Sequence, residues 1–145
     1  MPERETVERA REDAREGKSP STQAGEFVRE EIHHVREGKH GAANTKQAIA
    51  IGLSKARRAG VKLPATGSAS TRKKAQQDTR KARSHSKPST TRSRATESAL
   101  KKQPRSTASR SALSRQAKSA AASRGKRARS QAAKKAAETR TRRAA

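Results

Sequence analysis

Bulky apolar side chains are concentrated in one stretch of the first half of the chain, and their spacing predicts two helices. In the first, Val28, Ile32 and Val35 recur at i, i+4 and i+7, with Phe27 beside them. A helix over residues 21–37 would place these four side chains on one face and its charged side chains on the other. This is the pattern of a helix that packs on one side only.

The second helix is predicted over residues 44–59. Ile49, Gly52, Leu53 and Ala56 recur at i, i+3, i+4 and i+7 and would form its apolar face. Basic side chains occupy its last turn, where they suit the negative end of the helix dipole. The connection between the two helices is short, so we predict that they form an antiparallel helical hairpin around one small apolar cluster.

The ends of both helices carry specific signals. Asn44 or Thr45 can cap the first free amides of the second helix, and Gln47 follows Asn44 at the spacing of a capping box. Gly60 is placed to adopt the left-handed conformation after that helix. Gly38 is predicted to end the first helix in the same way.

A third, highly charged helix is predicted over residues 2–16, with Gly17 as its stop. Its apolar side chains are Val7, Ala10 and Ala14, a thin stripe at i, i+3 and i+7. Pairs of Glu and Arg at i,i+4 spacing add only about 0.2–0.5 kcal/mol each. We expect this helix to fray or to be solvated.

The composition changes at Pro64. Residues 1–63 carry 13 basic and 10 acidic side chains, whereas residues 64–145 carry 24 basic and 3 acidic ones. The second part has almost no bulky apolar side chains, and such chains cannot bury enough surface to fold. We expect disorder up to residue 104. The Ala-rich remainder would form helix only when phosphates neutralise its charge.

The predicted fold class is therefore all-α: a short helical head with a long disordered basic tail. The head comprises a charged N-terminal helix in residues 1–18 and the helical hairpin in residues 19–63, and the tail comprises residues 64–145. Leu, Ile, Val and Phe number only 12 of 145 residues. A hairpin with so small a core is expected to be marginal as a monomer, and to self-associate or to fold against a partner.

Two classes of protein are excluded by simple counts. The chain has no Cys, which rules out disulfides and zinc fingers. Its longest apolar run, residues 48–53, is too short to span a bilayer or to serve as the core of a signal peptide. We expect a soluble cytoplasmic protein with no membrane partner.

The charge itself predicts the function. The formal net charge is +24 at pH 7, and residues 64–145 hold +21 of it. Dense Lys and Arg bind polyanions because each neutralised phosphate releases condensed counterions. The only aromatic residue is Phe27, so there is no stacking platform for single strands or RNA loops. We predict sequence-independent nucleic-acid binding, with duplex DNA favoured over RNA and the head used for self-association or docking.

The predicted nucleic-acid-binding residues are the basic side chains at the end of the second hairpin helix and along the tail. They are Lys55, Arg57, Arg58, Arg72, Lys73, Lys74, Arg80, Lys81, Arg83, Lys101, Lys102, Arg124, Lys126, Arg127, Arg129, Lys134, Lys135, Arg140, Arg142 and Arg143.

Other roles remain open. The second hairpin helix could read bases as the recognition helix of a helix-turn-helix, although its exposed basic face is equally typical of a solvated helix. The head could instead be an adapter that recognises a protein while the tail supplies electrostatic attraction. An RNA- or ribosome-associated role is the third alternative. A membrane-active peptide is disfavoured, because the tail has almost no bulky apolar side chains to insert.

The sequence contains no arrangement typical of a catalytic or metal site. His33 and His34 are adjacent, so on a helix they point about 100° apart and cannot chelate together. With His40, they are expected to lie on the surface. The adjacent carboxylates Glu30 and Glu31 are expected on the charged face of a helix. We therefore predict no enzymatic activity, no metal and no cofactor.

Two resemblances support this interpretation. The segment Phe27–Gly60, above all its run KQAIAIGLSKARRAG, resembles a small bacterial domain of unknown function, a family with no known activity. The run departs from that family at Gly52 and Lys55, where Ala and Glu are usual. The tail, with QAAKKAA among its segments, is similar in composition to the tails of linker histones and bacterial histone-like proteins. Together the resemblances imply a nucleoid-associated bacterial protein.

Overall fold

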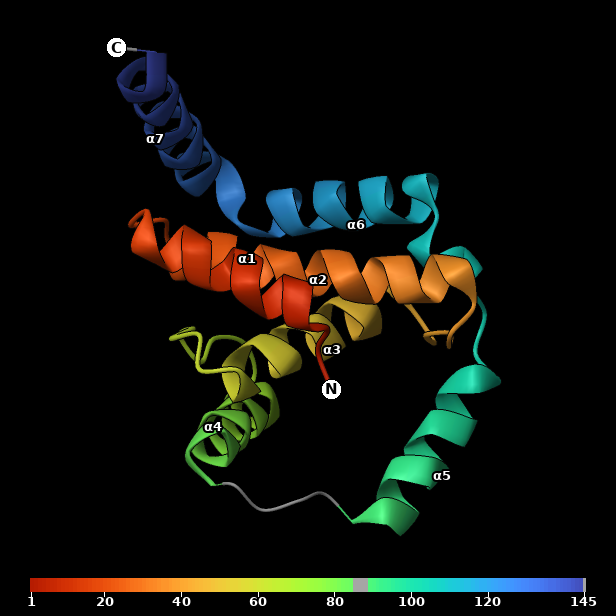
Figure 1. The fold of residues 1–145 in the computed structure, drawn as a ribbon. Coiled ribbons are helices and arrows are strands. Elements are labelled where there is room, and N and C mark those ends of the chain that lie inside the picture. Colours follow the sequence, from red (N-terminus) through yellow and green to blue (C-terminus); the bar gives the residue numbers. More distant parts are fainter. Residues whose placement is uncertain (85–88, 145) are drawn as a thin grey trace. The chain divides into compact units, whose positions relative to one another are not determined.

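The computed structural model describes residues 1–84 and 89–144, and within these the chain forms helices and no strand (Figure 1). The predicted all-α class is confirmed. The elements are α1 (Arg4–Arg15), α2 (Pro20–Glu37), α3 (Thr45–Arg58), α4 (Ala69–Arg83), α5 (Thr90–Lys101), the 3₁₀ turn η1 (Ser106–Ala108), α6 (Arg110–Ser123) and α7 (Gly125–Ala144).

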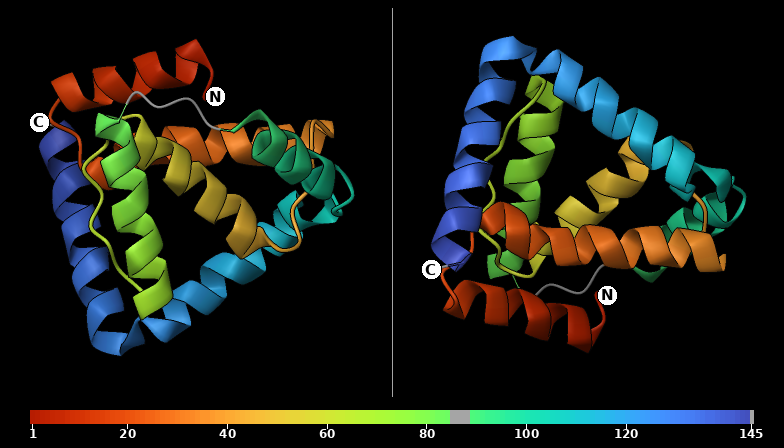
Figure 2. Two further views of the ribbon diagram at one scale, coloured as in Figure 1. Left: turned by 90° about the horizontal axis from the view of Figure 1, so that it is seen from below. Right: turned by 90° about the horizontal axis from the view of Figure 1, so that it is seen from above.

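The chain divides into two compact units, Met1–Ser109 and Arg110–Ala145, and each is described by itself. The predicted helical hairpin is α2 and α3, which pack on each other, and α3 crosses α2 obliquely (Figure 2). The predicted boundaries after residues 18 and 63 fall in the connections before α2 and α4. The first unit continues beyond them to include α4, α5 and η1.

The predicted signals at the ends of α3 are confirmed. The Asn44 side chain accepts a hydrogen bond from the Gln47 amide at 2.8 Å, and the Gln47 side chain accepts one from the Ala43 amide at 2.6 Å. Gly60 has a φ of 97°, and the Val61 amide donates to the carbonyl of Ala56 at 3.0 Å. This pattern is a Schellman motif, which satisfies carbonyl groups left open at the end of the helix.

The core of the first unit is built around Phe27, whose side chain is fully buried. Ala10 of α1, Ala24 of α2 and Ala56 of α3 surround it. Helix α1 therefore packs on α2 and buries Thr6 as well as Ala10, so the expectation that it would be solvated is wrong. Although its side chain is small, Ala10 belongs to the buried cluster around Phe27, and this contact helps to hold α1 against α2.

Helices α2 and α3 come close together at Gly52. A Cβ atom on this residue would lie 2.7 Å from Cα of Val28 and 3.0 Å from the carbonyl oxygen of Phe27. These are backbone atoms of α2 and cannot rotate away. A hydrogen at this position is therefore what allows the two helices to approach so closely.

The structure does not support a disordered tail. Residues 64–84 and 89–144 contain four α-helices and η1. Ala, Lys, Arg and Gln, which dominate this part of the chain, are strong helix formers, and composition rules for disorder do not weigh that propensity. Helix α4 also has a cap, because the Ser68 side chain accepts a hydrogen bond from the Thr71 amide. It packs on α3 through Ala75 and Asp78, both buried.

Residues 100–108 return to the connection between α2 and α3, and backbone and side-chain hydrogen bonds join them to it and to the adjoining ends of the two helices. The Gly41 amide donates to the Leu100 carbonyl at 2.9 Å, and the Thr45 hydroxyl donates to the Thr107 carbonyl at 2.7 Å. The Arg36 guanidinium donates to the Ala108 carbonyl at 2.8 Å. These bonds join η1 and the end of α5 to the hairpin.

The second unit consists of α6 and α7. Neither helix has a buried residue, and polar and charged side chains surround α7 on all sides. Across the described residues, each helix is too short or too polar to traverse a lipid bilayer.

We predict that Gly52→Ala destabilises the protein, whereas Gly25→Ala stabilises it. Both are helical glycines, and alanine gains up to about 1 kcal/mol of helix propensity at either site. At Gly25 the new Cβ meets nothing within 4 Å, so this gain is retained. At Gly52 the clash with α2 adds an overpacking penalty of about 1–3 kcal/mol. Urea denaturation followed by circular dichroism measures both, and equal stabilisation by the two substitutions would contradict the close crossing.

Candidate nucleic-acid interface

Helix α4 presents a basic face on the side away from its contact with α3. Ala75 and Asp78 mark the buried side. Helical periodicity places Lys73 and Arg80 on the opposite side, and Arg72 and Arg83 on the flank between that side and Ala75; all four are exposed. From the first to the last of these residues the helix rises about 16 Å, which spans several phosphates of one nucleic-acid strand.

An open depression adjoins this face. It is lined by Ala65, Gln76, Thr79, Arg80 and Arg83 and has a volume of about 260 Å³. Its two guanidinium groups each offer planar donors that match two phosphate oxygens at once. Chemically, the depression is suited to a phosphate group.

The second unit carries the densest positive charge. It has twelve Lys and Arg residues and one acidic residue, Glu138. Helices α6 and α7 bury no residue, so these cations are exposed to solvent along both helices. The eight basic residues of α7 point in all directions around its axis, which excludes a single binding face and suits contact with phosphates from any side.

Some of the predicted binding residues are bound within the protein. The Arg58 guanidinium donates two hydrogen bonds to the buried carboxylate of Asp78, at 3.0 and 2.9 Å, and Lys74 lies 3.7 Å from the same oxygen. Lys101 pairs with Glu97 at 2.8 Å on the exposed surface of α5. Arg58 thus joins α3 to α4, a structural role that the sequence does not reveal.

Lys55 lies inside the first unit. Its ammonium group is 3.0 Å from Oε1 of Glu30 and 2.8 Å from Oε2 of Glu31, and its side chain is only 20% exposed. The side chains of the two carboxylates are 2% and 0% exposed. One cation of α3 therefore neutralises two adjacent acids of α2. The expectation that both acids lie on the charged face of a helix is wrong, because it considered their helix without the one that packs on it.

The pKa values of this group shift in the direction of mutual stabilisation. Burial alone would raise the pKa of Glu30, but hydrogen bonds from Lys55 and from the Glu3 amide outweigh it and lower that pKa. Burial likewise opposes the charge of Lys55, and the two carboxylates overcome it and raise the pKa of its ammonium group. Both groups are therefore charged at neutral pH.

A sequence signal for this buried pair exists. Glu31 stands four residues after Phe27 and four before Val35, so it continues the line of the apolar face. Phe27 and Val35 are both fully buried. An acid in such a line needs a cation on the facing helix, although the sequence alone does not say which one.

The histidines also differ from the sequence prediction. His33 is on the surface as expected, with its side chain 66% exposed and paired with Glu37. The side chains of His34 and His40 are only 12% and 16% exposed, so both rings are partly buried rather than fully on the surface. Helix α2 and the turn after it bring both rings toward Glu31.

Sixteen of the twenty predicted binding residues form no ion pair within the described chain, and one of them, Arg57, differs from the other fifteen. Arg57 donates to the Pro64 carbonyl at 3.3 Å, and its Nε is buried. The fifteen exposed cations are Arg72, Lys73, Arg80, Lys81, Arg83, Lys102, Arg124, Lys126, Arg127, Arg129, Lys134, Lys135, Arg140, Arg142 and Arg143.

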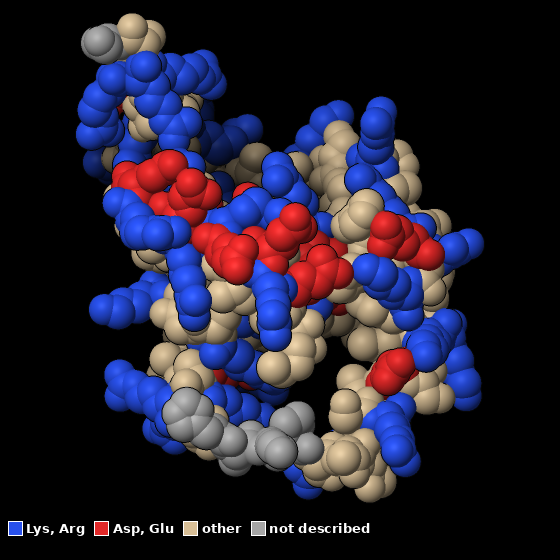
Figure 3. Space-filling view, in the orientation of Figure 1, with Lys and Arg blue, Asp and Glu red and all other residues tan. Residues whose placement is uncertain are grey.

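The acidic side chains are segregated from these cations. On the face shown in Figure 3, Asp and Glu gather over α1 and the adjoining part of α2, whereas Lys and Arg dominate the visible surfaces of α4 and α7. Of the eight acidic residues among the first 30, six lie in α1 or directly beside it, namely Glu3, Glu5, Glu8, Glu12, Asp13 and Glu16, and Glu26 of α2 pairs with Arg9 of α1. Helix α1 has four arginines and four acids, so it offers a polyanion no net positive charge.

Comparison with known proteins finds a similarity for one segment of the chain. Residues 18–66 match a family of unknown function (DUF6496). The matched range covers α2, α3 and the residues after α3, and it contains the segment whose resemblance to a small domain of unknown function was predicted. No curated protein and no solved structure matches the chain.

We predict that Lys55→Met lowers the free energy of unfolding by about 3–5 kcal/mol at pH 7, the range found when one partner of a buried ion pair is removed. Methionine keeps most of the side-chain volume, so the loss reports charge. Lys46→Met, an exposed change on the same helix, should alter stability by less than about 0.5 kcal/mol. Chemical denaturation measures both.

The pH dependence of the same variant has a predicted sign. In the wild type, the pKa of Glu30 is lowered from its usual value of 4.5. Ionised Glu30 therefore stabilises the fold above pH 4.5, and this stabilisation is lost as the pH falls through the lowered pKa. In Lys55→Met, protonation relieves a buried unpaired charge, so stability should rise as pH falls. A parallel decline in both proteins would show that Lys55 does not neutralise Glu30.

We predict that acid loosens α4 from α3 through Asp78. Burial alone would raise the pKa of this carboxyl, but hydrogen bonds from Ser54 and Arg58 lower it below its usual 3.8. Its contribution is therefore present above pH 3.8 and lost as pH falls through the lowered value. In Asp78→Asn, amide hydrogen exchange in α4 should be faster than in the wild type at pH 7. Glu97→Gln, which removes an exposed pair on α5, should leave it unchanged.

Proposed function

We propose that this protein binds nucleic acid without sequence specificity, through the exposed cations of α4, α6 and α7. The observation that carries the proposal is the separation of its charges into two classes. Lys55 and Arg58 are held by buried carboxylates, whereas fifteen predicted binding residues have no acidic partner in the described chain. Unpartnered, exposed cations release counterions when they meet phosphates, which is the main source of such affinity.

Recognition of the backbone follows from the kinds of side chain available. Lys and Arg contacts to phosphates position a protein but carry no sequence information. Helix α3 is poorly suited to base readout, since Arg58 and Lys55 on it are engaged internally. Duplex DNA, with one charge per about 1.7 Å of its axis, is the favoured partner because it offers the highest density of phosphates.

The first unit would contribute in two ways. It presents the α4 face and its depression as a structured phosphate site, and it is the part of the chain through which we propose that two chains associate. Self-association would make binding bivalent and raise the apparent affinity without new contacts. If chains self-associate in this way, the apparent affinity for nucleic acid should rise with protein concentration.

We predict that replacing Arg72, Arg80 and Arg83 by Gln weakens binding to duplex DNA and flattens its salt dependence. Each lost phosphate contact reduces the slope of log K against log[salt] by about 0.9, so three contacts reduce it by about 2.7. The matched control replaces Arg4, Arg11 and Arg15 by Gln. It removes the same charge with the same chemistry, but from exposed positions of the acid-rich helix α1.

Fluorescence anisotropy with a labelled duplex at several salt concentrations measures both triple variants in the full chain. The proposal predicts a smaller slope for the α4 variant and an almost unchanged slope for the α1 variant. Equal changes would show that net charge alone sets binding and that the α4 face is not a contact. Tighter binding to RNA than to duplex DNA would instead favour the RNA-associated role.

A further inference from the structure

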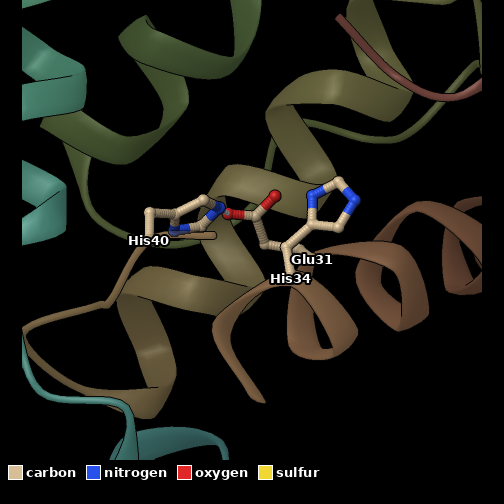
Figure 4. Close-up of side chains that lie close together, drawn as sticks. All are labelled: Glu31, His34 and His40. Atoms are coloured by element: carbon tan, nitrogen blue, oxygen red, sulfur yellow. Dashed lines mark ion pairs between the residues drawn. The ribbon is translucent and has the colours of Figure 1, made fainter. Parts of the chain in front are cut away.

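We propose that Glu31, His34 and His40 form a binding site for Zn²⁺. One potential ligand atom from each residue lies within 4.8 Å of those of the other two. Figure 4 shows the Glu31 carboxylate between the two imidazole rings, whose centroids are 6.1 Å apart. Two imidazoles and one carboxylate are a ligand set that zinc accepts, with water as the fourth ligand.

The ring of His40 is held in the orientation that a ligand needs. Its Nδ1 lies 3.0 Å from the carbonyl oxygen of Gly41, which can only accept a hydrogen bond, so Nδ1 carries the hydrogen. The other nitrogen, Nε2, lies 3.1 Å from Oε1 of Glu31. In the neutral ring this nitrogen carries a lone pair, so two acceptors face each other and a cation between them is favourable.

The distance between these two atoms suits a metal. In a tetrahedral site with bonds of about 2.0–2.2 Å, neighbouring ligand atoms are roughly 3.3–3.5 Å apart. The 3.1 Å between His40 Nε2 and Glu31 Oε1 is close to that edge length. Only a small rearrangement would be needed to place Zn²⁺ against both atoms.

His34 has the corresponding support from the opposite side. Its Nε2 lies 2.9 Å from Oε1 of Glu3, so the carboxylate accepts its hydrogen and leaves Nδ1 available. A carboxylate that holds the outer nitrogen of a ligating histidine is the usual outer shell of a zinc site. Its Nδ1 lies 4.0 Å from Oε1 of Glu30, and a shift of the ring that keeps the bond to Glu3 would bring this nitrogen toward Glu31.

The Glu31 carboxylate supplies an independent observation. It is fully buried, and neither of its oxygens accepts a hydrogen bond of ordinary geometry, although Lys55 and His40 lie at ion-pair distance. Lys55 approaches Oε2, so Oε1 is the oxygen left to a metal. Lys55 neutralises the carboxylate at Oε2, and a metal ion at Oε1 would give the other buried oxygen the partner that such groups usually have.

The identity of the cation follows from the ligands. Imidazole nitrogens favour Zn²⁺ and neighbouring transition metals, whereas Mg²⁺ and Ca²⁺ prefer oxygen ligands. The site would tie the turn that contains His40 to the last turns of α2, and so would stabilise the hairpin. It does not depend on the proposed binding of nucleic acid.

The test is a titration of the nuclease-treated full-length protein with Zn²⁺ against a competing chromophoric chelator. The expected result is one Zn²⁺ per chain and a higher melting temperature when the metal is present. His34→Ala and His40→Ala should each lower the affinity at least about 10- to 100-fold, the loss typical of even an outer-shell change. His33→Ala is the matched control, because its exposed ring pairs with Glu37, and it should bind Zn²⁺ like the wild type.

A second measurement needs no variant and so does not depend on the folding of one. In nuclear magnetic resonance spectra of the wild type, Zn²⁺ should shift the ring nitrogen signals of His34 and His40 and leave those of His33 in place. The same concentration of Mg²⁺ should have no effect. Absence of these shifts, or equal affinity in the His33, His34 and His40 variants, would overturn the proposal.

Discussion

Two neighbouring carboxylates buried on α2 set the condition that the rest of the first unit must meet. Glu30 and Glu31 lie on the inner side of a helix in a chain with few apolar side chains to offer. Lys55 of α3 neutralises both, and this requires the two helices to cross closely, which Gly52 permits. Charge and backbone approach are therefore linked at one crossing: without the close approach the ammonium would not reach the acids.

Because bulky apolar side chains are few, the remaining helices of the first unit are attached mainly through polar contacts. Asp78 joins α4 to Arg58 of α3, and side-chain hydrogen bonds join η1 to the ends of the hairpin helices and to the turn between them. Acids used in this way hold a few cations inside the protein and leave most of the others without a partner. The exposed surplus is what the proposed function uses, so the internal ion pairs decide which cations are free to meet phosphates.

Local features of the fold could be predicted from sequence, whereas features that depend on the crossing of helices could not. Asn44 and Gly60 predicted the two ends of α3 correctly, because helix capping depends only on residues a few positions apart. The partnership of Glu31 with Lys55 joins residues on different helices, and its register follows from the packing at Gly52. Composition suggested disorder beyond Pro64 because it measures burial and net charge. It neglects helix propensity and the single buried acid of α4.

The most direct test of the central claim is the affinity of the full-length wild-type protein for two duplexes of unrelated sequence, measured over a range of salt concentrations. The account predicts equal affinities at each salt concentration and a steep common slope, near −9 for about ten phosphate contacts. A shallow slope, or a preference for one sequence that persists at high salt, would contradict it and show that the exposed cations are not the binding surface.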